Sequence, residues 1–184
     1  DADYRACDIN AKNGVLEFNI VYHDASRDTD EPVCKSNFTI LSSGEFNIDN
    51  ALLATSIGSE LNVPYEDMKE ALYNVKVPGR MEVVKSRGGR IAIVDFAHNK
   101  LSFIKLFEAA KKEYPDKKIA IVFGTPGGKA YDRRALMGMI AAKNADKVYI
   151  TEDDPYIEKA EDICEEIRAE AVKYSNDIVV VLNR

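Results

Sequence analysis

The chain opens with a segment in which apolar and polar residues alternate. In residues 14–24 every second side chain is apolar, the period of two that is typical of a β-strand with one buried face. The apolar residues on this face are Leu16, Phe18, Ile20 and Tyr22. Residues 33–40 predict a second strand, and the polar segment 24–32 predicts a hairpin or loop between the two. We expect both strands at the edge of a sheet.

Two helices are predicted next. Apolar residues recur at near-helical spacing after Asn47, the expected N-cap. These apolar residues are Ile48, Leu52, Ile57 and Leu61. A second amphipathic segment follows Pro64, since proline is favoured at helix starts. The Val-Pro-Gly segment 77–79 ends this helix, and we predict a domain boundary there, with domains at residues 1–78 and 79–184.

From Arg90 onward the pattern becomes a repeat of strand and helix. Short runs of Ile and Val with apolar residues on both faces predict strands buried on both sides, as in a parallel sheet. The strands are expected at residues 91–96, 119–123, 148–151 and 178–182, and amphipathic helices at about 101–113, 132–144 and 160–173. This alternation predicts an α/β, Rossmann-like domain with right-handed crossovers.

Composition fits an ordinary globular chain and narrows its partners. Of 184 residues, 46% are hydrophobic and 30% charged, enough for a substantial core. The three cysteines show no CxxC spacing, which argues against a disulfide framework or a zinc cluster. A net charge of −6 argues against non-specific nucleic-acid binding. The sequence shows neither a membrane-spanning run nor a signal-peptide pattern, so we expect a cytoplasmic protein with a small-molecule or protein partner.

Polar residues that follow the predicted strands are the candidate site, because open parallel sheets bind ligands at the carboxyl ends of their strands. Asp95 ends one strand, where it could accept hydrogen bonds from two ribose hydroxyls or act as a turn acid. For His98 a structural role is favoured over a catalytic one, and Asn99 is the expected cap of the next helix. Two further residues are candidates, and for Arg80 a surface position is the default. Arg80 could reach an interdomain cleft, and Asn50 could present its amide to a purine edge.

The sequence GTPGGK at residues 124–129 resembles a phosphate loop but lacks its spacing and its magnesium-binding hydroxyl. What remains is a glycine-lined turn with Lys129, Arg133 and Arg134 near a helix start, which could seat a carboxylate or phosphate. A tight turn with solvated basic residues is the alternative.

The acidic run Glu152-Asp153-Asp154 follows the third predicted strand. Its carboxylates repel one another unless a cation such as an ammonium group or a metal binds. Solvated turn acids are the commoner explanation of such runs.

Four segments, taken in order and spacing, resemble the Mur ligases of peptidoglycan synthesis, most closely the branch that adds the third stem-peptide residue. They read FNIDNALLATSIGSELNV, VPGRMEVV, IAIVDFAHNKLSFIKLFEAA and FGTPGGKAYDRRALMGMIAAKNADKVYITEDDP. The resemblance covers residues 40–165. It implies that residues 79–184 are the family's C-terminal domain and that residues 1–78 are the β/α tail of its central, ATP-binding domain.

This resemblance implies an ATP-dependent amide ligase. The carboxylate of a UDP-N-acetylmuramoyl-dipeptide would be phosphorylated to an acyl phosphate and then attacked by the amine of a diamino acid. The cofactors would be ATP and Mg²⁺, with the metal ligands expected outside this chain, so we expect the 184 residues alone to be inactive. The resemblance also assigns ATP-binding roles: Asn50 to adenine, Arg80 to ATP across the domain boundary, Asp95 to ribose, and His98 and Asn99 to the same nucleotide edge.

The family's amino-acid site would include Lys129 and Arg133, with Lys129 holding the incoming carboxylate. Residues Asp153, Asp154 and Tyr156 occupy the place of the family's Asp-Asn-Pro-Arg motif, whose Arg pairs with the extra carboxylate of diaminopimelate. Here Tyr replaces that Arg and Asp replaces the Asn, which favours a cationic side chain such as that of L-lysine.

Two alternatives stay open. One is a non-catalytic module that binds a nucleotide or an amino acid. The other is a ligase similar to folylpolyglutamate synthetase, against which the GRMEVV and Asp-Asp-Pro segments argue.

Overall fold

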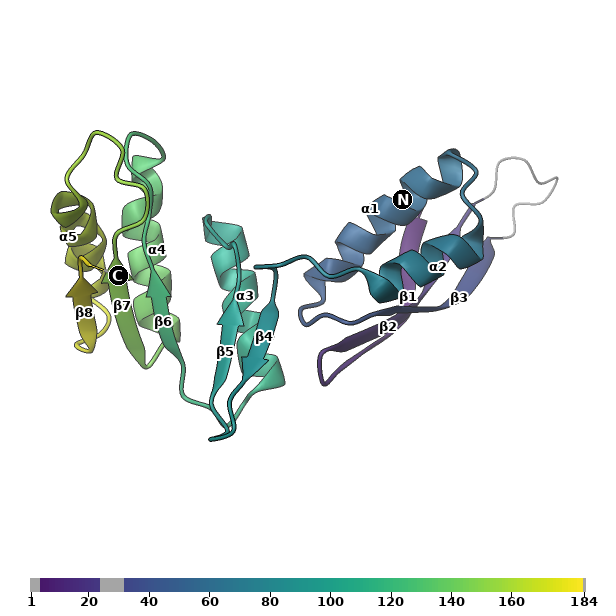
Figure 1. Cartoon of the computed structure of the whole chain (residues 1–184), viewed down its shortest axis with the longest axis horizontal. Coiled ribbons are helices and arrows are strands. Elements are labelled where there is room, and N and C mark those ends of the chain that lie inside the picture. Colours follow the sequence, from purple (N-terminus) through teal and green to yellow (C-terminus); the bar gives the residue numbers. More distant parts are fainter. Residues whose placement is uncertain (1–3, 24–31, 184) are drawn as a thin grey trace. The chain divides into compact units, whose positions relative to one another are not determined.

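The computed structural model describes residues 4–23 and 32–183. The chain divides into two compact units, residues 1–96 and 97–184 (Figure 1). The domain boundary predicted at residues 78 and 79 falls inside the first of these units and stays a prediction.

The first unit begins with an antiparallel sheet in the order β1-β2-β3. Its strands are β1 (Tyr4–Lys12), β2 (Val15–Tyr22) and β3 (Val33–Ile40). The two strands predicted here are confirmed, and Phe18 pairs with Phe38 across the sheet with their rings stacked 5.6 Å apart. Their expected place at the edge of a sheet is wrong for β2, which lies in the middle and pairs with both β1 and β3. Of the loop predicted at residues 24–32, residues 24–31 lie outside the described part of the chain.

Strand β1 was not predicted from the sequence, although a signal for it exists. Asn13 and Gly14 join β1 to β2 as a two-residue turn with φ of 55° and 78°. Positive φ at both positions is the type I′ geometry that Asn-Gly favours in hairpins.

Helices α1 (Phe46–Glu60) and α2 (Tyr65–Asn74) pack against this sheet. The core of the unit consists of Leu16, Phe18, Ile20, Phe38, Ile40, Ile48 and Ala51. The predicted face of α1 is partly wrong, because Ile57 is 53% exposed while Thr55 is buried. The predicted cap is also wrong: α1 starts at Phe46, and Asn47 instead donates hydrogen bonds from Nδ2 to Ser42 Oγ at 3.0 Å and to the Ser43 carbonyl oxygen at 2.8 Å.

A hairpin of β4 (Glu82–Lys85) and β5 (Ile91–Val94) completes the first unit. The strand predicted at residues 91–96 therefore exists but was wrongly placed in the parallel sheet, since β5 pairs antiparallel with β4. Val94 is 50% exposed, so this apolar run is not buried on both faces.

The second unit has the predicted alternation of strand and helix. The parallel sheet has the order β6-β7-β8 (Figure 1). Its elements are α3 (Lys100–Glu113), β6 (Ala120–Phe123), α4 (Tyr131–Asn144), β7 (Lys147–Thr151), α5 (Ala160–Ala171) and β8 (Ile178–Val181). The α/β fold is thus confirmed.

The core of the second unit joins all three helices to the middle of the sheet. Its buried residues are Phe103, Phe107, Met137, Ile140, Ala141, Val148, Ile150, Ile163, Cys164 and Ile167. Helices α4 and α5 approach closely, because a Cβ at Gly138 would overlap the carbonyl oxygen of Ile167. This packing fixes the two helices whose preceding loops carry the candidate site.

Candidate functional site at the carboxyl edge of the parallel sheet

The loops that follow β6 and β7 are joined through their backbones. The N–H of Gly127 donates a hydrogen bond to the carbonyl oxygen of Asp154 at 2.8 Å. A Cβ at Gly127 would overlap the carbonyl group of Pro155, so only glycine permits this approach. The glycine loop, residues 124–130, and the acidic turn, residues 152–159, therefore form one surface at the end of the sheet.

An ion pair between the buried Arg134 and the partly exposed Glu158 holds these two loops together. The Arg134 side chain is 1% exposed, and its Nη1 and Nη2 donate to Glu158 Oε2 and Oε1 at 3.0 and 2.8 Å. Oε1 of Glu158 also accepts the N–H of Gly128 at 2.5 Å, and Arg134 Nη1 bonds Glu166 at 2.9 Å. A bidentate pair of this kind combines charge with a fixed geometry.

The ion pair sets the charge state of its members. The hydrogen bonds from Arg134, followed by that from the Gly128 N–H, lower the pKa of the Glu158 carboxyl. The hydrogen bond to Glu158 raises the pKa of the Arg134 guanidinium above its ordinary value, against the opposing effect of burial. Both groups are therefore charged at neutral pH.

This arrangement changes one expectation for the glycine loop. The N–H groups of Gly127 and Gly128 already bond Asp154 and Glu158, and Arg134 is buried against its glutamates. These groups are thus already bonded within the chain, and a carboxylate or phosphate seat at Lys129 and Arg133 stays a prediction. Its exposed cation is Lys129.

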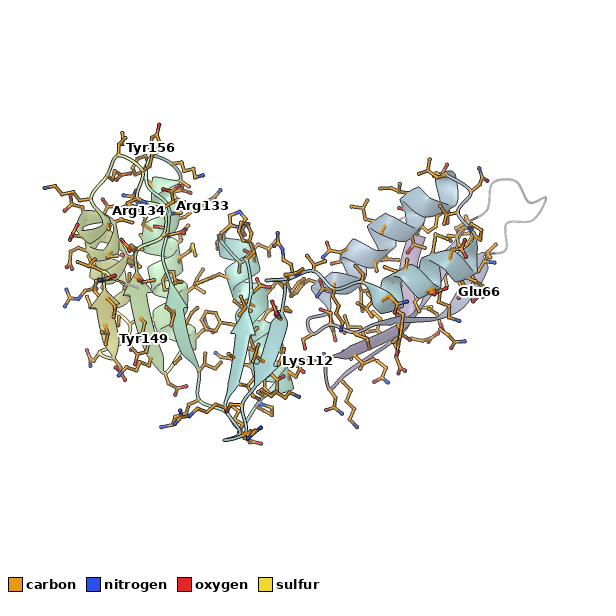
Figure 2. The ribbon with its side chains drawn as sticks, viewed as in Figure 1. Glu66, Lys112, Arg133, Arg134, Tyr149 and Tyr156 are labelled. Carbon is orange, nitrogen blue, oxygen red and sulfur yellow. The ribbon has the colours of Figure 1, made fainter. Side chains whose placement is uncertain are left out.

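Arg133 lies apart from this network. Its Nη1 donates to the carbonyl oxygen of His98 at 3.4 Å, which ties the start of α4 to the segment before α3. Figure 2 shows Arg133, Arg134 and Tyr156 at the same end of the second unit.

The acidic turn faces solvent. Asp153 and Asp154 are exposed, and Tyr156 is 75% exposed with a left-handed φ of 54°. Asp154 Oδ1 accepts the N–H of Tyr156 at 3.3 Å, which shapes the turn. Within residues 4–23 and 32–183, no Lys or Arg forms an ion pair with Asp153 or Asp154. Lys129, Asp153, Asp154 and Tyr156 thus belong to two joined loops, and their common amino-acid site stays a prediction.

Arg80 and Asp95 lie at one end of the β4–β5 hairpin. Asp95 Oδ2 accepts the N–H of Met81 at 2.9 Å, and Met81 is buried with a φ of 49°. The guanidinium of Arg80 lies 4.8 Å from the ring centre of Phe96. Asn50 is exposed on α1, where its Nδ2 donates to Asn47 Oδ1 at 3.2 Å.

His98 and Asn99 stand at the start of the second unit. Asn99 Oδ1 accepts the N–H of Ser102 at 3.0 Å in a capping box, which confirms the predicted helix cap. His98 is exposed, and its backbone N–H donates to Ser102 Oγ at 3.2 Å. The residues expected to bind ATP are divided between the two units, and their common site stays a prediction.

Glu158 and Glu166 were not identified from the sequence. Their role depends on Arg134, which lies 24 and 32 residues away. Arg134 also stacks on the ring of Tyr131 at 4.6 Å. No local spacing pattern indicates such pairs, because they form only when α4 packs against α5 and the turn that precedes α5.

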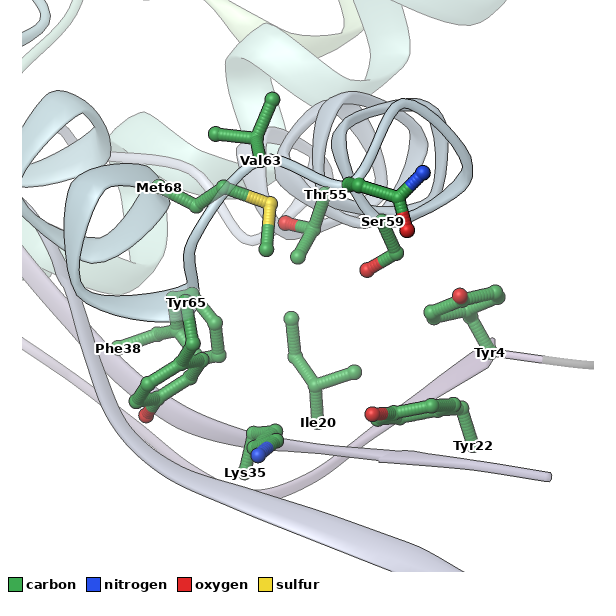
Figure 3. A pocket seen from close by; sticks show the side chains of 11 residues that line it. Tyr4, Ile20, Tyr22, Lys35, Phe38, Thr55, Ser59, Val63, Tyr65 and Met68 are labelled. Atoms are coloured by element: carbon green, nitrogen blue, oxygen red, sulfur yellow. The ribbon is translucent and has the colours of Figure 1, made fainter. Parts of the chain in front are cut away.

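The first unit holds a pocket that no predicted site residue lines. It has a volume of about 270 Å³ and lies among β1, β2, β3 and the two helices. In Figure 3 the stacked rings of Tyr4 and Tyr22 form one side of the pocket, Tyr65 lies on the opposite side, and Lys35 lies between them. Lys35 Nζ lies 5.2 Å from the centre of the Tyr65 ring.

The described part of the chain lacks two features. Among the described residues, no group of three or more His, Cys, Asp or Glu side chains is placed to hold a metal ion. Among the same residues, no helix is long and apolar enough to cross a membrane.

The fold and the joined loops define an α/β domain whose candidate ligand site is the carboxyl edge of its parallel sheet. The family model described as "Mur ligase, glutamate ligase domain" matches residues 79–184, more than half of the chain. The chain belongs to the Mur ligase family, and the resemblance found in its sequence is confirmed.

Curated relatives agree with this family. A UDP-N-acetylmuramyl-tripeptide synthetase of Lactobacillus delbrueckii is 36% identical over 80% of this chain and 28% of its own length. A UDP-N-acetylmuramoyl-L-alanyl-D-glutamate–L-lysine ligase of Enterococcus faecalis is 34% identical over 77% and 28%. The corresponding 2,6-diaminopimelate ligase of Thermosynechococcus vestitus is 34% identical over 92% and 33%. The chain thus spans about a third or less of the length of these relatives.

A solved structure shares the fold. Mycobacterium tuberculosis folylpolyglutamate synthase complexed with ADP matches with a TM-score of 0.77 at 16% identity, over 100% of this chain and 38% of that chain. At this identity the likeness concerns the fold alone.

Proposed function

We propose that the chain is part of an ATP-dependent ligase that adds a diamino acid, preferably L-lysine, to UDP-N-acetylmuramoyl-L-Ala-D-Glu through an acyl phosphate. The observation that carries this proposal is the exposed acidic turn, residues 152–159, bonded to the glycine loop in a chain of the Mur ligase family. The names of its relatives, which include an L-lysine ligase and a diaminopimelate ligase, support a diamino acid.

Charge favours lysine over diaminopimelate. Asp153 and Asp154 are exposed, and within the described residues no Lys or Arg neutralises them. A terminal ammonium group would relieve their mutual repulsion, whereas a second carboxylate would add to it. Tyr156 has no charge with which to pair such a carboxylate. In this proposal Lys129 and Arg133 bind the α-carboxylate of the amino acid, and the acidic turn binds its side chain.

The ATP site is proposed for Asn50, Arg80, Asp95 and His98. Asp95 is half-buried and held by Met81, so its carboxylate is fixed in the way that recognition of ribose hydroxyls needs. Arg80 presents an exposed guanidinium suited to phosphate. Because the Asn99 amide oxygen already caps α3, we assign to Asn99 the positioning of this helix start beside the nucleotide.

ATP would supply the phosphoryl group that activates the substrate carboxylate, and Mg²⁺ is proposed to bind residues outside this chain. The residues described here would orient the amine of the incoming amino acid for attack. Orientation of this kind accounts for a large part of the rate in such reactions. We also propose the domain division at residues 1–78 and 79–184, in accordance with the match that begins at residue 79. The cytoplasmic location stays a prediction.

The test is a ligation assay with the full-length gene product, ATP, Mg²⁺ and UDP-N-acetylmuramoyl-L-Ala-D-Glu. We expect ADP release and a tripeptide product with L-lysine, and a lower kcat/KM with diaminopimelate. Glutamylation of a folate with no reaction on the muramoyl-dipeptide would refute the proposal. The 184-residue chain alone is expected to be inactive in this assay.

A further inference from the structure

We propose that Glu158 is a positioning residue for the amino-acid site: its carboxylate joins the glycine loop, residues 124–130, to the acidic turn, residues 152–159, and so fixes where Asp153, Asp154 and Tyr156 stand. This inference rests on the proposed function, because it assigns a task to the same site.

The bonding pattern of Glu158 is the first argument. One oxygen, Oε1, accepts both the Gly128 N–H and Arg134 Nη2, while Oε2 accepts Arg134 Nη1. A carboxylate can accept all of these bonds at once, whereas an amide has a single acceptor oxygen. Glu158 therefore connects the backbone of one loop to the start of α4, while belonging itself to the other loop.

The burial of Arg134 is the second argument. Its side chain is 1% exposed, and a buried guanidinium without its carboxylate is strongly unfavourable. This requirement draws Glu158 inward and holds the chain segment around it. Tyr156, two residues earlier, is 75% exposed, and Asp153 and Asp154 are exposed as well. The exposed side chains that would contact the substrate thus belong to a turn whose position is fixed by the pair of Glu158 with the buried Arg134.

Glu166 provides the matched control. It bonds the same guanidinium at 2.9 Å, but its side chain is 55% exposed and it belongs to α5. A Glu166→Gln variant loses one charge beside Arg134 and leaves the Gly128 and Glu158 contacts in place. A Glu158→Gln variant keeps only one acceptor oxygen, so it cannot hold the Gly128 N–H and both Arg134 nitrogens at once, and the connection that Glu158 makes between the loops is weakened.

The experiment compares both variants in the full-length gene product by steady-state kinetics and amide hydrogen exchange. For Glu158→Gln we expect a rise of roughly tenfold or more in the KM for lysine, a kcat within about threefold of wild type and an unchanged KM for ATP. The amide of Gly128 should exchange at least about tenfold faster, because the loss of its hydrogen bond to the charged Glu158 carboxylate costs about 1.5–3 kcal/mol. Glu166→Gln should change none of these quantities by more than about threefold.

Separate results overturn separate claims. An unchanged KM for lysine in an active Glu158→Gln enzyme would refute the positioning role alone, and so would equal effects of the two variants. A wild-type product that ligates neither lysine nor diaminopimelate would refute the proposed function before any variant is compared. If Glu158→Gln fails to fold, Glu158→Asp replaces it, since its carboxylate is one methylene too short to reach both loops.

Discussion

The carboxylate of Asp95 accepts the backbone N–H of Met81 at 2.9 Å and thereby closes the end of the β4–β5 hairpin. Met81 is buried in a left-handed conformation, which costs free energy that this bond helps to offset. An Asp95→Ala variant should therefore lose the protection of the Met81 amide, with exchange roughly tenfold faster or more, as expected for a lost hydrogen bond to a charged acceptor. Asp95→Asn keeps an acceptor oxygen and should retain most of the protection. Equal exchange in both variants would contradict this role.

Gly127 cannot carry a side chain where it stands. A methyl group would overlap the Pro155 carbonyl, so Gly127→Ala must push the two loops apart and break the bond to Asp154. We expect a loss of about 1–3 kcal/mol, the usual cost of overpacking, seen as a lower Tm by circular dichroism. The control is Gly88→Ala, whose added Cβ meets nothing nearer than 3.9 Å. Equal Tm values for the two variants would refute the close approach.

Ala130, in the same loop, should respond in the opposite direction. It is the N-cap of α4 and has a φ of 53°, a left-handed conformation that disfavours alanine. Ala130→Gly removes this strain and places a better cap residue at the helix start. We expect a gain of about 1 kcal/mol in the free energy of unfolding, measured by urea denaturation. A loss of stability would show that the strain is absent.

The ion pair of Glu158 predicts a pH dependence. Its carboxyl has a lowered pKa in the folded chain, first because of Arg134 and then because of the Gly128 N–H. A lowered pKa means that the folded state binds this proton less readily than the unfolded state does. The stabilisation is therefore complete above the unfolded pKa of about 4.3 and disappears as the pH falls through the lower, folded value.

Thermal unfolding from pH 7 to pH 3 checks this dependence. The Tm difference between wild type and Glu158→Gln should be constant near neutral pH and shrink below about pH 4.3. A difference that does not change across this range would show that the carboxylate charge has no part in stability.

Substrate preference gives the prediction most specific to the proposed function. Asp154→Asn combined with Tyr156→Arg should raise the ratio of kcat/KM for diaminopimelate to that for lysine, by roughly tenfold to a hundredfold. This range corresponds to one charge-assisted pair of about 1.5–3 kcal/mol. The control combines Asp154→Asn with Ile157→Arg. Ile157 is 82% exposed, and an Arg at this position gives the variant the same net charge with the guanidinium one residue away. Unchanged selectivity in the first variant would refute the charge argument.

Local signals in the sequence were sufficient for most elements of the second unit. Asn99 was correctly predicted as a helix cap, and the strands at β6, β7 and β8 were correctly predicted from short runs of Ile and Val. Such signals depend on residues within a few positions of one another, so they can be recognised without knowing which distant segments pack together.

Pairing between distant segments could not be derived in the same way. The apolar run of β5 suits a buried parallel strand equally well as a hairpin, and only its partner β4 decides. The missing clue was the Ser-Arg-Gly-Gly turn at residues 86–89, where Gly89 has a φ of 74°. The same holds for Arg134 in the site, since its sequence neighbours do not indicate the distant glutamates with which it forms ion pairs.

The bond between Gly127 and Asp154 joins main chain to main chain, so it places no demand on the identity of the side chain at Asp154. The Asp154 side chain accepts the Tyr156 N–H, and the amide oxygen of an Asn can accept the same bond, so Asp and Asn are interchangeable there, whereas Gly127 and Glu158 are not replaceable in this way. A ligase with this frame could change its preference to another amino acid through substitutions at Asp154 and Tyr156, while the backbone of the two loops stays the same.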